Sequence, residues 1–161
     1  MRTLITTLWL GIALLLLLAS CAPGAAGSGP GSPFELPSNE PAQVSPGRSL
    51  YLRQTFPATA FGFSEADLQW RWVPLGTRGL TANLTSEFQV VDPVMPEGWS
   101  WRLDNARVDS RDGTSPTYTV TLRVDVPAGA RLGGQRISAT VVTPRTGRRQ
   151  NVAVVVQVVG P

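Results

Sequence analysis

Residues 117–126, TYTVTLRVDV, alternate strictly between apolar and polar side chains. Successive side chains of a β-strand point to opposite faces of the sheet, so this pattern predicts a strand with one face in the core and one face in water. The predicted core face carries Tyr118, Val120, Leu122, Val124 and Val126, and the predicted water face carries Thr119, Thr121, Arg123 and Asp125.

Shorter runs with the same period are separated by turn residues, and no segment has a convincing helical period. Pro144-Arg145-Thr146-Gly147 lies between the last two runs and predicts a hairpin turn. About seven strands in about 120 residues predict an all-β fold, an immunoglobulin-like antiparallel β-sandwich. The other predicted strands are residues 49–56, 67–73, 87–91, 98–103, 135–143 and 151–159.

Two stretches resemble bacterial Ig-like domains that are associated with alpha-galactosidases and surface proteins. Residues 91–103, VDPVMPEGWSWRL, carry the P-E-G-W strand start of that family, and residues 125–142, DVPAGARLGGQRISATVV, resemble its C-terminal strand-turn-strand. The resemblance covers about residues 40–161, including Val44-Ser45-Pro46-Gly47, and implies an accessory module without catalytic residues. Independently of the family, Pro96 suits a strand start, Gly98 relieves the turn, and Trp99 is expected in the core.

The N-terminus has the parts of a secretory signal peptide, predicted over residues 1–20. Arg2 supplies the positive charge, residues 8–18 supply the apolar region, and Ala19 and Ser20 are small. A spanning helix needs about 20 apolar residues, so an uncleaved membrane helix is the less favoured alternative.

Leu18-Ala19-Ser20-Cys21 resembles a bacterial lipobox. The resemblance implies that Cys21 carries a diacylglycerol and an acyl chain such as palmitate. Two or three chains hold a protein firmly to a bilayer. Ordinary secretion with a free cysteine is the alternative. Residues 21–37 are then the lipidated cysteine and a flexible Gly/Pro/Ser linker, and residues 38–161 are the Ig-like domain. Ala22, in the place where aspartate favours inner-membrane retention, weakly favours the outer membrane.

The missing residue types exclude much chemistry. The chain has no histidine, all 14 basic residues are arginine, and Cys21 is the single cysteine. Ser-His-Asp and Cys-His nucleophiles, Schiff-base lysines and zinc sites are therefore excluded. A net charge of +3 gives little support for nucleic-acid binding. We expect no enzyme, no cofactor and no metal, although a carboxylate hydrolase stays open in principle.

Four tryptophans are candidate binding residues, because aromatic faces stack on sugar rings. Trp70 with Trp72, and Trp99 with Trp101, form i, i+2 pairs beside leucine. This spacing places each pair on one strand face, which normally faces the core, so a core role is favoured over a stacking platform.

Charged clusters give two weaker candidates. Arg145, Arg148 and Arg149 flank the predicted hairpin, with Arg131 and Arg136 near a neighbouring turn, and they suit anionic lipid, cell-wall polymer or an acidic partner if they are not simply solvated. Asp104, Asp109 and Asp112 offer oxygens for calcium, although such residues usually mark turns.

Together these patterns predict a lipid-anchored extracytoplasmic protein that acts as a structural or protein-interaction module of a bacterial envelope. The alternative is a carbohydrate- or cell-wall-binding module that uses exposed tryptophan. Unpaired strand edges are a further means of contacting another chain.

Overall fold

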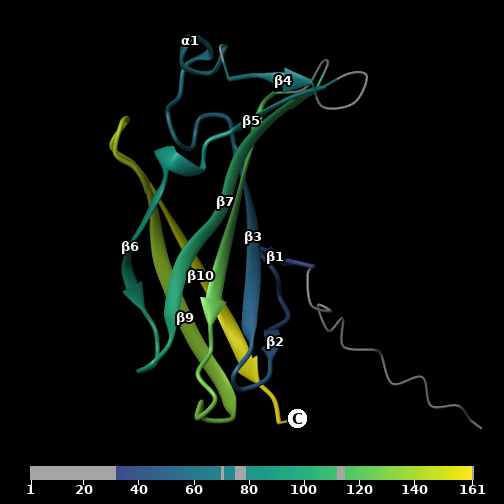
Figure 1. Ribbon diagram of the computed structural model, residues 1–161, viewed down its shortest axis with the longest axis vertical. Helices are drawn as coiled ribbons and strands as arrows, with labels where there is room; N and C mark the ends of the chain where they lie inside the picture. The colour runs from purple at the N-terminus through teal and green to yellow at the C-terminus, as the bar shows by residue number, and fades with distance from the viewer. Residues whose placement is uncertain (1–31, 70, 75–78, 112–114, 161) are drawn as a thin grey trace, which may run out of the picture.

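Two β-sheets packed face to face make up the computed structural model, which describes residues 32–69, 71–74, 79–111 and 115–160 (Figure 1). The predicted all-β sandwich is confirmed. A short helix, α1 (Glu65–Leu68), and a 3-10 helix, η1 (Thr85–Glu87), lie between the strands β3 (Ser49–Pro57) and β6 (Gln89–Val94). The first sheet has the order β1 (Phe34–Leu36), β3 (Ser49–Pro57), β8 (Thr117–Asp125), β7 (Ser100–Arg111), β5 (Gly79–Asn83) and β4 (Val73–Pro74). The second has the order β2 (Ala42–Val44), β10 (Arg148–Val158), β9 (Gly133–Thr143) and β6 (Gln89–Val94).

The strand order is that of an immunoglobulin-like fold. β1-β3-β8-β7 corresponds to strands A-B-E-D, and β6-β9-β10 corresponds to C-F-G. The strands β4 and β5 are additions within the connection from B to C, and β2 is a second piece of strand A on the other sheet. Because β1 pairs with β3 and β2 with β10 in parallel, both sheets are mixed, whereas the sequence predicted antiparallel pairing throughout.

The central strand β8 confirms the predicted inner face, since its apolar residues are at most 1 % exposed. Its outer face is not fully in water as predicted: Thr119 and Thr121 are 9 % and 7 % exposed. Thr119 lies between Thr55 of β3 and Arg107 of β7, and Thr121 lies between Arg53 and Asn105 of the same two strands. The side chains of the flanking strands therefore shield both threonines from water. The alternation in β9 and β10 also holds, with Ile137, Ala139, Val141, Val152, Val154, Val156 and Val158 buried.

The strand β7 is longer than predicted and runs through residues 104–111, which were expected to form turns. Along β7, the residues whose side chains face the core change from odd-numbered to even-numbered, because the pairing register with β8 shifts between Leu103 and Asn105. Trp101 and Leu103 face the core before the shift, and Ala106 and Val108 are fully buried after it. A bulge places two residues opposite one, so it hides a strand from a search for strict alternation.

The strand predicted at residues 67–73 is wrong over most of its described part. Asp67 and Leu68 belong to α1, Gln69 follows in a helical conformation, and only Val73 lies in a strand. Ser64 caps the helix: its side chain accepts from the Asp67 N–H, and the Asp67 carboxylate accepts from the Ser64 N–H. This reciprocal capping box stabilises a helical turn in spite of the alternating pattern.

The folded domain begins earlier than Ser38. Residues 34–36 were assigned to the linker, but they form β1, with Leu36 8 % exposed and Glu35 paired with Arg53 at 2.9 Å. Two turn predictions are confirmed. Residues 144–147 connect β9 to β10, and Gly98 has a φ of +80° directly before Trp99, which is 8 % exposed.

Candidate functional site

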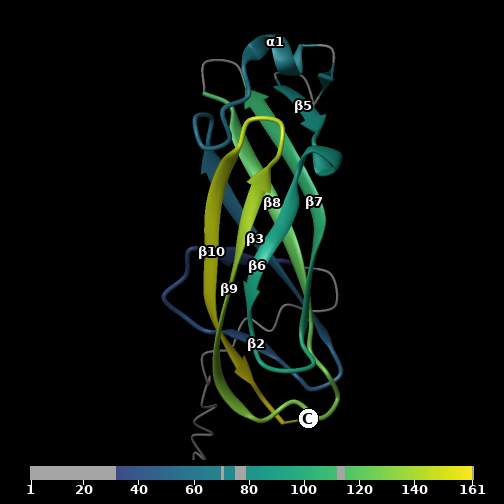
Figure 2. The same ribbon diagram turned by 90° about the vertical axis from the view of Figure 1, so that its left-hand side faces the viewer.

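The end of the sandwich that carries α1 is called the apex here; it is formed by residues 58–69, 71–74, 79–88 and 144–147 (Figures 1 and 2). In immunoglobulin-like folds the B–C and F–G connections lie together at one end, and these two segments are their counterparts. Thr146 Oγ1 donates to the Phe61 carbonyl at 2.6 Å, and Gln150 Nε2 donates to the Ala60 carbonyl at 2.9 Å. The two connections are therefore held together by side-chain to backbone hydrogen bonds.

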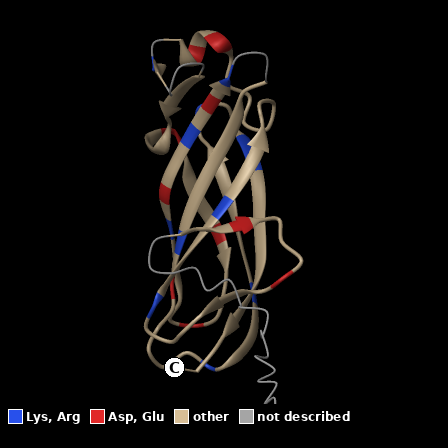
Figure 3. Ribbon diagram, turned by 90° about the vertical axis from the view of Figure 1, so that its right-hand side faces the viewer, with Lys and Arg blue, Asp and Glu red and all other residues tan. Residues whose placement is uncertain are grey.

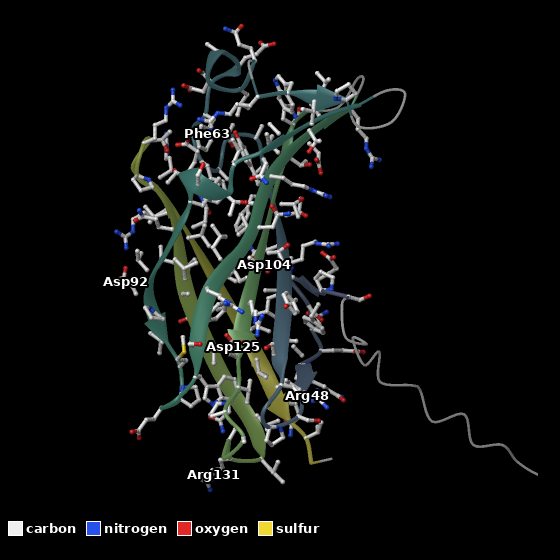
Figure 4. The ribbon with its side chains drawn as sticks, viewed as in Figure 1. Arg48, Phe63, Asp92, Asp104, Asp125 and Arg131 are labelled. Atoms are coloured by element: carbon white, nitrogen blue, oxygen red, sulfur yellow. The ribbon has the colours of Figure 1, made fainter. Side chains whose placement is uncertain are left out.

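An aromatic cluster fills the interior beneath the apex. The fully buried ring of Phe61 packs edge-on against Phe56, Phe88 and Tyr118, with ring centroids 5.1, 4.7 and 5.5 Å away. The half-buried ring of Phe63, labelled in Figure 4, makes tilted contacts with Phe88 and Tyr118, with ring centroids 6.1 and 5.9 Å away. Edge-to-face packing of this kind stabilises a core beyond the burial of area. The B–C connection is thus anchored to the sandwich by its own residues.

Charged groups fix α1 to the turn between β9 and β10. Arg145 forms an ion pair with Asp67. The hydrogen bonds from Ser64 lower the pKa of Asp67 most, and the Arg145 guanidinium lowers it further. Beside them, burial raises the pKa of Tyr118 to about 12, with the nearby Asp67 charge adding to the rise. Asp67 is therefore ionised and Tyr118 neutral near pH 7.

A ribbon of β4 and β5 projects from the apex and leaves apolar side chains in solvent. Val73 pairs with Thr81 across the ribbon, and Pro74 pairs with Leu80. Val73 is 52 % exposed and Leu80 43 % exposed, on opposite faces. The ribbon thus leaves one large apolar side chain in solvent on each face at its outer end, whereas Ala82 of β5 is fully buried. The alternating pattern of the sequence does not predict this ribbon, although the Val73-Pro74 pair is a signal for an edge strand.

Of the arginines predicted as a basic patch, Arg145 lies at the apex and Arg148 and Arg149 begin β10 next to it, but two of the three form ion pairs within the chain. Arg145 pairs with Asp67, and Arg149 pairs with Asp92. Arg148 is exposed and lies over Gly62, where a Cβ would come within 3.2 Å of its Cγ. Arg131 and Arg136 are elsewhere: Arg131 lies at the opposite end from Phe63, and Arg136 is on β9 (Figure 4). The five arginines do not form one cluster.

The tryptophans are not brought together. Trp70 lies outside the described residues, and Trp72 is half-buried at the apex, packed against the core. Trp99 is buried and Trp101 half-buried on the inner side of the first sheet's lower part. The Trp101 indole N–H is interior and has no hydrogen-bond partner among the described residues. These positions favour packing over the display of flat aromatic faces to a sugar.

The aspartates considered for calcium are also apart. Asp104 and Asp109 lie five positions apart on β7, a separation of roughly 16 Å along a strand, too far to ligate one ion. Asp109 accepts from Thr81 Oγ1 at 2.6 Å and pairs with Arg107 at 3.1 Å. Asp112 lies outside the described residues. In the described ranges no three His, Cys, Asp or Glu side chains are grouped as metal ligands.

The outer face of the six-stranded sheet carries paired charges (Figure 3). Asp125 accepts from Ser49 Oγ and from Arg123 Nε, both at 2.6 Å. These bonds, the one from Ser49 first, lower the pKa of Asp125, and the same carboxylate raises the pKa of Arg123. On this face Arg53, Arg102, Arg107 and Arg123 are paired with three carboxylates, and Asp125 serves two of these arginines.

Comparisons of the chain with protein-family models, with curated proteins and with solved structures found no match. Across the described ranges no helix is long and apolar enough to cross a membrane.

Proposed function

We propose that this protein is a lipid-anchored extracytoplasmic interaction module of a bacterial envelope, which binds a protein partner through its apex. The anchor in this proposal is Cys21, and support for it comes from the lipobox-like Leu18-Ala19-Ser20-Cys21 and the apolar residues before it. The described domain starts β1 at Phe34. Residues 22–33 can reach no further than about 43 Å when fully extended, so the domain stays near the bilayer.

The observation that carries the interaction role is the exposure of two large apolar side chains, Val73 and Leu80, in the described part of the ribbon. Val73 and Leu80 stay in solvent, whereas β5 is held to β7 by antiparallel pairing over Gly79–Asn83 and by the fully buried Ala82. A contact surface held in this way loses little conformational entropy on binding. The partner that suits it is a protein with an apolar surface, because the ribbon itself carries no charged residue in its described part.

The anchor is tested by the Cys21→Ala variant expressed in a bacterium with a lipoprotein pathway. The wild-type protein is expected in the membrane fraction with the added mass of a diacylglyceryl group and an acyl chain. The variant is expected to lack this mass and to leave the membrane fraction. A variant that stays with the membrane and a wild type without lipid mass would refute the anchor.

The apex is tested by placing the photo-crosslinking residue p-benzoylphenylalanine at Leu80 in intact cells. The matched control places it at Thr55, which is exposed on the outer face of β3. We expect one discrete protein adduct from Leu80, which the Val73→Asp substitution weakens, and no such adduct from Thr55. No adduct at Leu80, or the same adducts from both positions, would argue against the apex.

Carbohydrate binding is the second candidate, and half-buried Trp72 at the apex is the observation that favours it. Cell-wall glycan added to the purified protein would then shift the tryptophan emission, and Trp72→Phe would abolish the shift. An unchanged emission spectrum at saturating glycan would contradict carbohydrate binding, and protein binding would be the remaining proposal.

A further inference from the structure

The strand β10 has a neighbour on one side only along part of its length. β9 pairs with it over the whole of Arg148–Val158, but β2 pairs only with Val156, Gln157 and Val158. At the other end, the hydrogen bond from Gln150 to Ala60 holds the B–C connection against the strand. Residues 151–155 lie between these two covers with no second partner strand among the described residues (Figure 2).

Whether a residue of β10 directs its backbone N–H and C=O groups toward this opening follows from whether its residue number is odd or even. The Val159 N–H donates to the Val44 carbonyl at 3.0 Å, so odd-numbered residues direct their backbone groups toward the side of β2. In an antiparallel pair, residues alternate between facing the partner and facing away, and the β9–β10 register is continuous. Asn151, Ala153 and Val155 therefore present their N–H and C=O groups to the open side.

This opening lacks the features that protect the other edges. The edge strand β4 has two residues and ends at Pro74, and β6 contains Pro93 next to Asp92, which has a φ of +50°. Residues 151–155, NVAVV, contain no proline, glycine or charge. Proteins normally protect exposed edges by such means, because an unpaired row of N–H and C=O groups is a template for another strand.

The core beside the opening is slightly uncovered. Val154 is 8 % exposed, whereas Val152 and Val156 on the same inner face are 1 % and 0 % exposed. The connection from Leu36 to Ala42 crosses from the first sheet to the second, so no described residue pairs with residues 151–155 in the row that β2 occupies. A strand added there would continue this row, and its inward side chains would cover Val154.

A second copy of β10 does not fit this opening. Antiparallel pairing centred on Ala153 would put Gln150 of the second copy opposite Val156 and its Arg148 opposite Val158. The row beside Val156 and Val158 is already filled by β2. The opening is closed at both ends, so it admits a segment of about five residues, roughly 17 Å long, that turns outward at each end.

We propose that the open edge of β10 at residues 151–155 is a second protein-binding site, which accepts an extended, uncharged segment of another polypeptide as an added strand. Main-chain hydrogen bonds to Asn151, Ala153 and Val155 provide the affinity in such β-augmentation. Apolar side chains at alternate positions of the segment pack over Val154. The site lies on the sheet edge and uses none of the apical ribbon residues, so it stands independently of the proposed apical contact.

The test is backbone amide hydrogen exchange of the full-length protein in detergent, with and without the synthetic peptide Ac-TVTVTVT-NH2. Without peptide, the amides of Ala153 and Val155 are expected to exchange at least tenfold faster than that of Val154, which bonds to β9. Saturating peptide is expected to slow them at least tenfold. The control peptide Ac-TVTPTVT-NH2, which lacks a central N–H, is expected to protect them much less.

Two variants make the test specific to the edge. Ala153→Pro removes one open N–H without removing a bond to β9, and Val155→Lys adds a charge; both are expected to weaken peptide binding at least tenfold. Leu80→Asp at the apex is expected to leave it unchanged. The proposal is overturned if the Ala153 amide is already as protected as that of Val154, if millimolar peptide leaves the exchange unchanged, or if both peptides protect equally.

Discussion

Arg145, in the turn between β9 and β10, pairs with Asp67 of α1, although 78 positions separate them in the chain. The pair joins the F–G turn of the sandwich to the segment inserted between strands B and C. Together with the bond from Thr146 Oγ1 to the Phe61 carbonyl, it makes the apex one unit.

The pKa of Asp67 is expected to depend more on Ser64 than on Arg145. The hydrogen bonds from Ser64 are the first causes of its lowered pKa, and the Arg145 charge is a smaller one. Ser64→Ala should therefore raise the pKa of Asp67 more than Arg145→Gln does, as measured by carboxyl carbon NMR titration. The reverse order would mean that the ion pair dominates.

The lowered pKa of Asp67 also predicts how the free energy of unfolding changes at acidic pH. A carboxyl whose folded pKa is lowered stabilises the fold above its unfolded pKa, near 3.8, and this contribution is lost as the pH falls through the folded value. Urea unfolding of Asp67→Asn is therefore expected to show a weaker loss of stability below about pH 4 than the wild type.

Tyr118 is expected to destabilise the fold at high pH. Its folded pKa is raised to about 12 by burial, from the usual value of 10. The unfolded chain loses the phenol proton first, so stability is fully present below about pH 10 and falls as the pH rises through about 12, by up to about 3 kcal/mol. Urea unfolding at several alkaline pH values should show this fall, and Tyr118→Phe should remove most of it.

The aromatic cluster makes a sharp distinction between two phenylalanines. Phe61 is fully buried with three edge-on ring contacts, whereas Phe63 is half-buried with tilted contacts. Phe61→Ala is expected to lower the free energy of unfolding by about 3 to 5 kcal/mol, and Phe63→Ala by clearly less. Equal losses in urea unfolding would show that the apex does not depend on the Phe61 ring.

Much of the sandwich follows from alternation that survives in the sequence. Ile137, Ala139 and Val141 could be placed in the core because β9 and β10 pair without interruption. The predicted strands are wrong where a local structural feature interrupts the two-residue alternation of apolar and polar side chains. The bulge after Leu103 hid half of β7, and the capping box of Ser64 with Asp67 made a helix of an alternating segment.

The candidate site was less predictable because it depends on long-range pairing. The sequence around Arg145 and Arg149 does not predict an ion-pair partner for either side chain, because Asp67 and Asp92 are distant in the chain. The opening beside Ala153 depends on the chain crossing between sheets before Ala42, which composition does not specify. Short edge strands such as β1 carry too few residues for a periodic signal.

Alanine substitutions at two glycines distinguish destabilisation by backbone strain from destabilisation by steric crowding. Gly147, in the turn before β10, has a φ of +70°, and a Cβ added to it would meet nothing within 4 Å. Gly129, in the turn between β8 and β9, is equally open and has no positive φ. Gly147→Ala is therefore expected to destabilise the fold by about 1 kcal/mol through backbone strain alone, whereas Gly129→Ala should be neutral or stabilise it by a few tenths. Thermal unfolding of the two variants decides the point, because equal melting temperatures would mean that the turn does not hold Gly147 in the left-handed region.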